Sequence, residues 1–144
     1  MKRNLLIDSF YKNRKFKNII NLDAISQLQD NWNGYGAKKF SAALVMVCRQ
    51  IVEKISFQPN DISPTGRDSI QFEYELTDKS YLEFEFYLDK VGILFVPKNN
   101  YDDSISRTME FAPTIIIEMD MMIKLFIQRK FDDLKTLIGR IQND

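Results

Sequence analysis

The sequence predicts an α+β fold, in which a helical hairpin and C-terminal helices pack on a three- to four-stranded antiparallel sheet. Apolar residues recur at helical spacing in residues 16–56, alternate with polar residues in 70–88, and return to helical spacing from residue 113. Because the helices and strands follow one another in separate blocks, they should form segregated layers. A length of 144 residues fits a single domain, 1–144.

The N-terminal segment is basic. Residues 1–18 carry six lysines and arginines against one acid. Within residues 1–15, apolar side chains are interleaved with these charges, which fits a short packed element with solvated lysines. The alternative is a basic arm that contacts an acidic partner or a phosphate backbone.

Residues 16–56 are expected to form the helical hairpin. The first helix covers residues 16–29 and must end before Asn33 and Gly34, a dipeptide that favours a tight turn. Ser41 is placed to cap the second helix, which continues to about residue 56. Cys48 lies among apolar neighbours of this helix, so we expect a buried, unreactive thiol.

The sheet is expected within residues 61–111. Prolines at positions 59 and 64 indicate an extended connection before the first strand. A hairpin of residues 70–76 and 82–88 follows, and residues 91–96 and 105–111 are candidates for a third and a fourth strand. Alternation in the hairpin predicts one buried and one solvated face.

Four carboxylates are expected on the solvated face of the hairpin. Pairing of Leu76 with Leu82 matches the faces, gives a short turn, and places Glu75 opposite Glu83 and Glu73 opposite Glu85. Directly opposed like charges destabilise a strand pair. A solvated face tolerates this cost; otherwise basic residues of 1–18, a basic partner or a divalent cation offset it.

Two helices are expected in residues 113–142, with Pro113 in the first turn. The apolar face of the first helix consists of Ile115, Ile116, Met119, Met122, Ile123 and Phe126. Ile117, Met121 and Leu125 form a second stripe about 160° away. A helix that is apolar on two sides is fully buried or meets a partner. We expect burial, with a homodimer through this stripe as the alternative.

Composition excludes several functional classes. The chain contains no histidine, which excludes histidine-based triads, general bases and zinc sites. Zero formal net charge argues against a general nucleic-acid coat and leaves only the basic N-terminal arm for such contacts. No stretch approaches the ~20 apolar residues of a membrane span. We therefore expect a cytoplasmic protein without cofactor, metal or catalytic residue.

Two loops deserve comparison with ligand-binding motifs. Arg67, in residues 65–69, could clamp an anion, but the ending of a phosphate-binding P-loop is missing and a structural turn is favoured. The glycines of residues 33–36 lie between helices, which rejects a dinucleotide fingerprint. Trp32 and Tyr35 are expected to pin this loop to the core, and an exposed Trp32 anchor is the alternative.

The same segments carry a family resemblance. Residues 31–37 read Asn-Trp-Asn-Gly-Tyr-Gly-Ala, Pro64 and Thr65 follow, and residues 69–75 and 82–85 read Ser-Ile-Gln-Phe-Glu-Tyr-Glu and Leu-Glu-Phe-Glu. This resembles a widespread group of small bacterial proteins with a Trp-Asp-Gly/Ser-Tyr-Gly-Ala loop and a Leu-Glu-Ile-Glu strand. Asn33 stands where the group often has Asp. Such proteins are often encoded in mobile, toxin–antitoxin or phage-related settings, and the resemblance transfers no site.

The leading functional hypothesis is a non-enzymatic protein that binds and regulates a protein partner, in an antitoxin-like or phage-conflict role. The expected contact residues are Glu73, Glu75, Glu83, Glu85, Tyr81, Tyr87, Trp32, Tyr35 and Arg67. The alternative is a metal-dependent phosphodiester hydrolase that uses the four glutamates.

Overall fold

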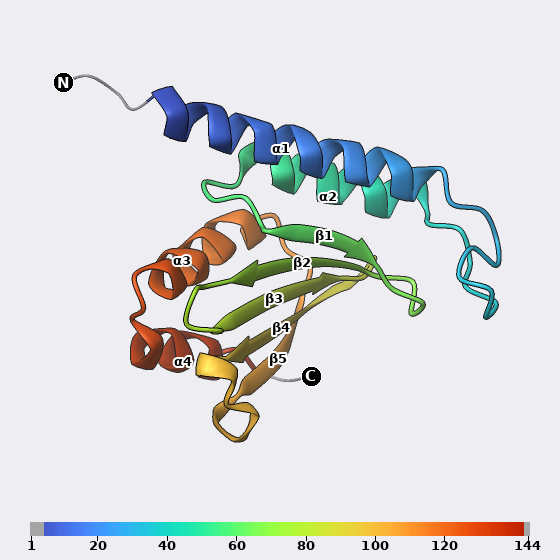
Figure 1. The fold of residues 1–144 in the computed structure, drawn as a ribbon. Helices are drawn as coiled ribbons and strands as arrows, with labels where there is room; N and C mark the ends of the chain where they lie inside the picture. Colours follow the sequence, from blue (N-terminus) through green and yellow to red (C-terminus); the bar gives the residue numbers. More distant parts are fainter. Residues whose placement is uncertain (1–4, 143–144) are drawn as a thin grey trace.

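The computed structural model describes residues 5–142, with side chains from residue 13 onward. The fold is α+β, with helices packed on an antiparallel five-stranded sheet of order β1-β2-β3-β4-β5 (Figure 1). The strands are β1 Asp61–Pro64, β2 Ile70–Glu75, β3 Tyr81–Phe86, β4 Lys90–Val96 and β5 Ile105–Glu110. The class and the antiparallel pairing are as expected, and the sheet has one strand more than expected.

The additional strand is β1, in the segment expected to be a connection. It pairs with β2 from Asp61 opposite Glu73 to Pro64 opposite Ile70. This strand was not predicted because its four residues, the last of them a proline, are too few to show an alternation of apolar and polar side chains. The structure accommodates the proline because β1 is an edge strand, where a missing N–H breaks no sheet hydrogen bond. Helix α1, Leu5–Ser26, lies along this edge (Figure 1).

Helix α1 and helix α2, Ala42–Lys54, form the helical hairpin. Helix α1 begins at Leu5, so it includes most of the segment treated above as an arm or short element; residues 1–4 lie outside the described residues. Ser41 caps α2 as expected, and its Oγ accepts a hydrogen bond of 3.1 Å from Leu44 N. Cys48 of α2 is fully buried, and this burial raises the pKa of its thiol.

The core lies between one face of the sheet and the helices. Alternate residues of β2, β3 and β4 join residues of α2 and of the two C-terminal helices in one buried cluster. Its largest fully buried side chains include Phe72, Phe84, Phe86, Phe95 and Phe126. Helix α3, Ile115–Ile127, and helix α4, Phe131–Gly139, follow the sheet and contact each other. The opposite sheet face therefore carries the other half of each strand's side chains.

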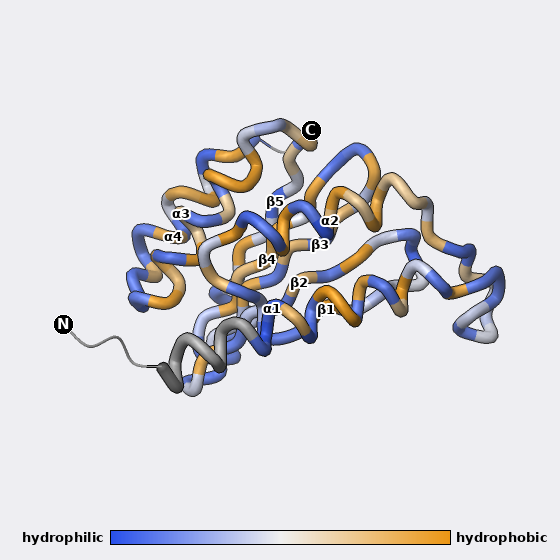
Figure 2. Tube along the Cα trace, turned by 90° about the horizontal axis from the view of Figure 1, so that it is seen from above, coloured by the Kyte–Doolittle hydropathy of each residue, from blue (hydrophilic) through white to orange (hydrophobic). Residues whose placement is uncertain are grey.

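The second apolar stripe of α3 is not buried, so the expectation of burial was wrong. Ile117 is 64% exposed and Met121 is 51% exposed, whereas Leu125 packs partly against the core. Helix α3 is hydrophobic along most of its length (Figure 2), yet it packs on the sheet with one side only. In the described part of the chain, no helix is both long and apolar enough for a membrane crossing.

Candidate functional site

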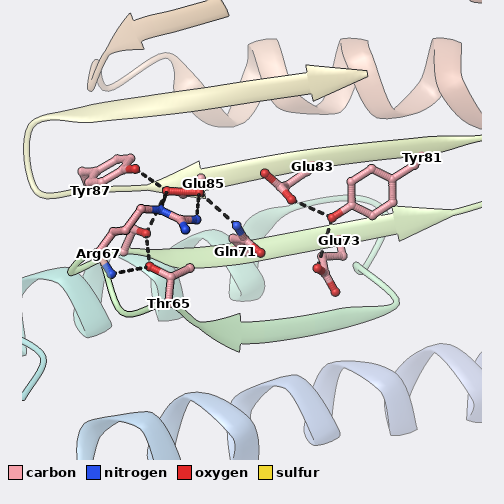
Figure 3. A network of polar contacts seen from close by, with 9 residues as sticks. Thr65, Arg67, Gln71, Glu73, Tyr81, Glu83, Glu85 and Tyr87 are labelled. Carbon is pink, nitrogen blue, oxygen red and sulfur yellow. Dashed lines mark hydrogen bonds and ion pairs between the residues drawn. The ribbon is translucent and has the colours of Figure 1, made fainter. Parts of the chain in front are cut away.

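The candidate site is the sheet face that points away from the core, here called the open face. The register aligns three carboxylates across neighbouring strands, Asp61 of β1, Glu73 of β2 and Glu83 of β3. Tyr81 and Glu85 lie on the same face of β3 (Figure 3). The structure thus brings together most of the expected contact residues of the hairpin.

The register of the hairpin differs from the expected one, and this changes the charge pairing. Glu75 lies opposite Tyr81 and Glu85 lies opposite Gln71, so neither of the two expected like-charge pairs exists. Glu73 lies opposite Glu83 instead, which is the one like-charge pair of the hairpin. The turn is shorter than expected because Lys79 adopts a left-handed conformation with φ of 70°. This lets Leu76 N donate to Ser80 O over 3.0 Å.

Glu85 is a buried carboxylate, with 8% of the residue exposed, and it is the most heavily hydrogen-bonded group of the open face. Its carboxylate accepts from Arg67 Nη2 and Gln71 Nε2, each over 2.9 Å, from Ser69 Oγ over 2.9 Å, and from the Tyr87 hydroxyl (Figure 3). Burial raises the pKa of this carboxyl, but these donors outweigh it and hold the pKa at about 2. Glu85 is therefore a charged, fully engaged anchor of the face.

Arg67 is held over Glu85 by the turn that precedes β2. Arg67 N donates to Thr65 Oγ1 over 3.1 Å, and Thr65 Oγ1 lies 2.5 Å from Ser69 Oγ. Hydrogen bonds to Glu85 and Tyr87 raise the pKa of the Arg67 guanidinium. The turn expected on sequence grounds is thus a structural support whose cation binds Glu85.

Glu73 and Glu83 share one donor. The Tyr81 hydroxyl lies 2.6 Å from Glu83 Oε1 and 3.1 Å from Glu73 Oε1 (Figure 3). A phenol has a single proton, so it serves one carboxylate fully at a time. Burial and the nearby charges of Glu85 and Glu73 raise the pKa of Glu83. This pair retains acceptor capacity that Glu85 has lost.

The loop of residues 31–37 is held by internal hydrogen bonds, but it is not pinned to the core by both aromatic rings. Tyr35 is 93% exposed, so the expectation that its ring packs on the core was wrong. Side-chain oxygens replace it, because Asn33 Oδ1 accepts from Tyr35 N and Ala37 N over 2.9 and 3.1 Å. Trp32 is half-buried; its Nε1 donates to Lys38 O over 3.2 Å, and its ring lies 6.0 Å from that of Phe40.

A shallow groove of about 700 Å³ crosses the open face over β3, β4 and β5. Glu83, Glu85 and Tyr87 line it together with Gly92 and Leu94, which the sequence reasoning missed. The missed signal is Gly92 itself, a glycine inside an otherwise β-prone run, since such a residue often marks close approach of a ligand.

Carboxylates of the face do not converge as a hydrolytic metal centre requires. Among the residues whose side chains the structure describes, no three acidic or cysteine groups are placed to hold a metal ion. The engagement of Glu85 removes a further candidate ligand. The described residues thus lack the three-ligand cluster that the phosphodiester hydrolase alternative would use.

Comparison of the chain with protein-family models, with curated proteins and with solved structures finds no match. Fold and face together define an α+β protein with helices on one side of its sheet and an acidic face on the other.

Proposed function

We propose that this protein is a non-enzymatic binding protein that recognises a basic protein surface through the open face. The observation that carries the proposal is the carboxylate row Asp61, Glu73 and Glu83, which crosses three strands on a face that the core helices leave open. Opposed carboxylates destabilise the sheet when it is alone. A cationic partner would turn this cost into binding energy.

Several of the described basic side chains pair with acids that do not belong to the row. Among the basic side chains, Lys15 pairs with Glu53 and Arg49 with Asp23, both on the helical hairpin. Arg67 pairs with Glu85 on the face itself. Complementary charge steers association and selects partners more than it sets affinity. A cationic protein surface is thus the chemistry that the face fits.

The biological setting that we propose is an antitoxin-like or phage-conflict role, in which the protein neutralises its basic partner. The motif resemblance of residues 31–37 and 69–75 supports this setting. The hydrogen-bonded loop that exposes Tyr35 would add an aromatic contact of the kind that dominates protein interfaces.

Affinity capture with a charge-reversed face tests the proposal. We expect the tagged wild type to capture a stoichiometric basic protein from its native cells, and the Glu73→Lys/Glu83→Lys variant to lose it. Asp102→Lys/Asp133→Lys is the matched control, because both aspartates are exposed and lie outside the open face. Capture should weaken as salt screens the charges. Equal capture by the wild type and the face variant would refute the proposal.

Self-association is a second candidate, favoured by the exposure of Ile117 and Met121 on α3 beside the partly buried Leu125. The partner would be a second copy that covers this stripe. Sedimentation of the wild type at micromolar concentration tests it, with Ile117→Lys/Met121→Lys as the comparison. A monomer in both would remove this candidate.

A further inference from the structure

Gly92 is a glycine that the sheet itself does not require. It stands in the middle of β4, opposite Glu85 on β3 and Thr108 on β5. Its φ lies outside the left-handed region, and a Cβ built on it would meet its nearest neighbour, Glu85 Cβ, at an ordinary 3.8 Å. A glycine within a strand nevertheless weakens the strand. Its presence calls for a reason on the open side of the sheet.

The absence of a side chain at this position gives the groove its bare floor. Backbone of Gly92 forms the floor, with Glu83 and Leu94 on one side of the position and Tyr87 on the other. A larger residue would project into this space, because alternation directs position 92 to the open face. The groove is thus shaped for a group that lies flat on the strand.

The polar groups of the groove differ in their capacity to bind that group. Glu85 is engaged by Arg67, Ser69, Gln71 and Tyr87 and offers little to a ligand. Glu83 Oε1 accepts a hydrogen bond of 2.6 Å from the Tyr81 hydroxyl, so this carboxylate is engaged by fewer donors than Glu85. Its strand neighbour on β4 is the apolar Leu94. A carboxylate beside an apolar side chain and a bare strand fits a cation on an apolar stem.

Two cations also line the groove, and both are engaged away from Glu83. Lys90 lies two residues before Gly92, and its Nζ stands 4.9 Å from the centre of the Tyr87 ring. Arg107 of β5 lies opposite Ile93, a position of β4 that faces the core. Its Nη1 donates to Ser106 O over 2.8 Å. The end of the groove at Glu83 and Leu94 is therefore the cation-accepting end.

We propose that the groove over Gly92 binds an arginine side chain of the basic partner. The stem lies on Gly92 and Leu94, and the guanidinium pairs with Glu83. Arginine fits better than lysine because its planar guanidinium is weakly hydrated and matches a carboxylate with two parallel hydrogen bonds. This inference rests on the proposed function and adds the residue type that the face selects.

Titration with a capped Gly-Arg-Gly peptide, followed by amide chemical shifts, tests the inference on the intact chain. We expect saturable shifts at Gly92 and Leu94 and weaker binding of capped Gly-Lys-Gly. Glu83→Gln should weaken arginine binding about fivefold, as loss of one ion pair does. Gly92→Val should weaken it about tenfold or more, because its branched side chain fills the floor.

A matched control lies on the same face outside the groove. Ser63→Val adds bulk on β1 and should bind like the wild type. Gly92→Ala, whose Cβ meets only ordinary contacts, serves if Gly92→Val fails to fold, and it should bind less tightly than the wild type.

The outcomes separate this inference from the proposed function. No saturable binding of the arginine peptide to the wild type, or equal binding by Gly92→Val and Glu83→Gln, would overturn the arginine site. Loss of partner capture in Glu73→Lys/Glu83→Lys would still stand as support for the acidic face. Partner capture that is insensitive to that reversal would instead overturn the proposed function.

Discussion

Arg67 and Glu85 are joined across 18 positions of sequence by an ion pair of 2.9 Å between Nη2 and Oε1. The carboxylate side chain is 11% exposed, whereas the arginine side chain is 61% exposed. Because Ser69, Gln71 and Tyr87 also donate to Glu85, the pair belongs to the support of the sheet. The open face therefore has a structural end at Glu85, whereas Glu73 and Glu83 at its other end share the single donor Tyr81.

Glu85→Gln is expected to destabilise the protein by about 2 to 3 kcal/mol at pH 7, because buried donors lose their charged acceptor. Urea unfolding at pH 7 measures the change. Glu75→Gln on the neighbouring strand is the control, since Glu75 is exposed and should change stability by less than about 0.5 kcal/mol. A neutral effect of Glu85→Gln would show that the network contributes nothing to folding.

The stability that Glu85 contributes should depend on pH. Its pKa is about 2 in the folded chain against an ordinary 4.5, so the contribution is present above pH 4.5 and is lost as pH falls toward 2. At about 1.4 kcal/mol per pH unit, the full effect is about 3 kcal/mol. The stability difference between the wild type and Glu85→Gln should shrink between pH 5 and pH 2.5. A difference that does not vary with pH would contradict this.

Glu83→Gln should have the opposite effect and stabilise the fold by about 0.5 kcal/mol at pH 7, because it removes the repulsion with Glu73. The pKa of Glu83 is raised, so its charged form is disfavoured in the folded state, and the gain should vanish as pH falls and the wild-type carboxyl becomes protonated. Thermal melting at pH 7 and pH 4 measures both values. A less stable variant at pH 7 would show that the pair is already compensated.

A Glu83→Gln variant that folds more stably but binds the peptide less tightly would show that Glu83 serves binding. Natural sites often keep groups that weaken the isolated fold. The arginine peptide supplies the second measurement on the same variant. Stability gained together with affinity lost would identify Glu83 as a recognition residue, whereas loss of both would assign it to the scaffold.

The elements of the fold could be predicted where the spacing of apolar residues along the sequence is that of a strand or of a helix. Alternation from Ile70 onward identified β2 and β3, and helical spacing identified α2 and α3. The register could not be predicted, because Lys79 takes a left-handed conformation that its residue type does not signal. Strand β1 was not predicted, because it is held by pairing with β2 and by contact with α1. The local sequence of β1 does not encode these tertiary contacts.

The residues that make up the site could be predicted from the sequence, but the role of each residue could not. The four glutamates share a sheet face as expected, but only the register shows that Glu85 meets Gln71 and that Glu73 meets Glu83. Exposure of Tyr35 was missed because a glycine-rich loop gives no sign of whether its side-chain amides or its aromatic rings hold it.

Two variants distinguish the exposed residue Tyr35 from Asn33, whose side chain holds the loop of residues 31–37: Tyr35→Ala and Asn33→Ala. Tyr35→Ala should leave the free energy of unfolding unchanged within about 0.5 kcal/mol, because its ring is 93% exposed. Asn33→Ala should cost about 1 to 2 kcal/mol, because two backbone N–H groups lose their acceptor. Urea unfolding of both variants gives these values.

Partner capture by the same two variants then tests the loop as part of the interface. Because Gly66 lies against Asn33, with an added Cβ 3.1 Å from Asn33 Nδ2, the loop is fixed beside the turn that carries Arg67. Because hydrogen bonds fix the backbone that carries Tyr35, little loop ordering should oppose a contact made by its ring. We expect Tyr35→Ala to weaken capture about tenfold with stability intact. Undiminished capture would exclude Tyr35 from the interface and confine recognition to the sheet.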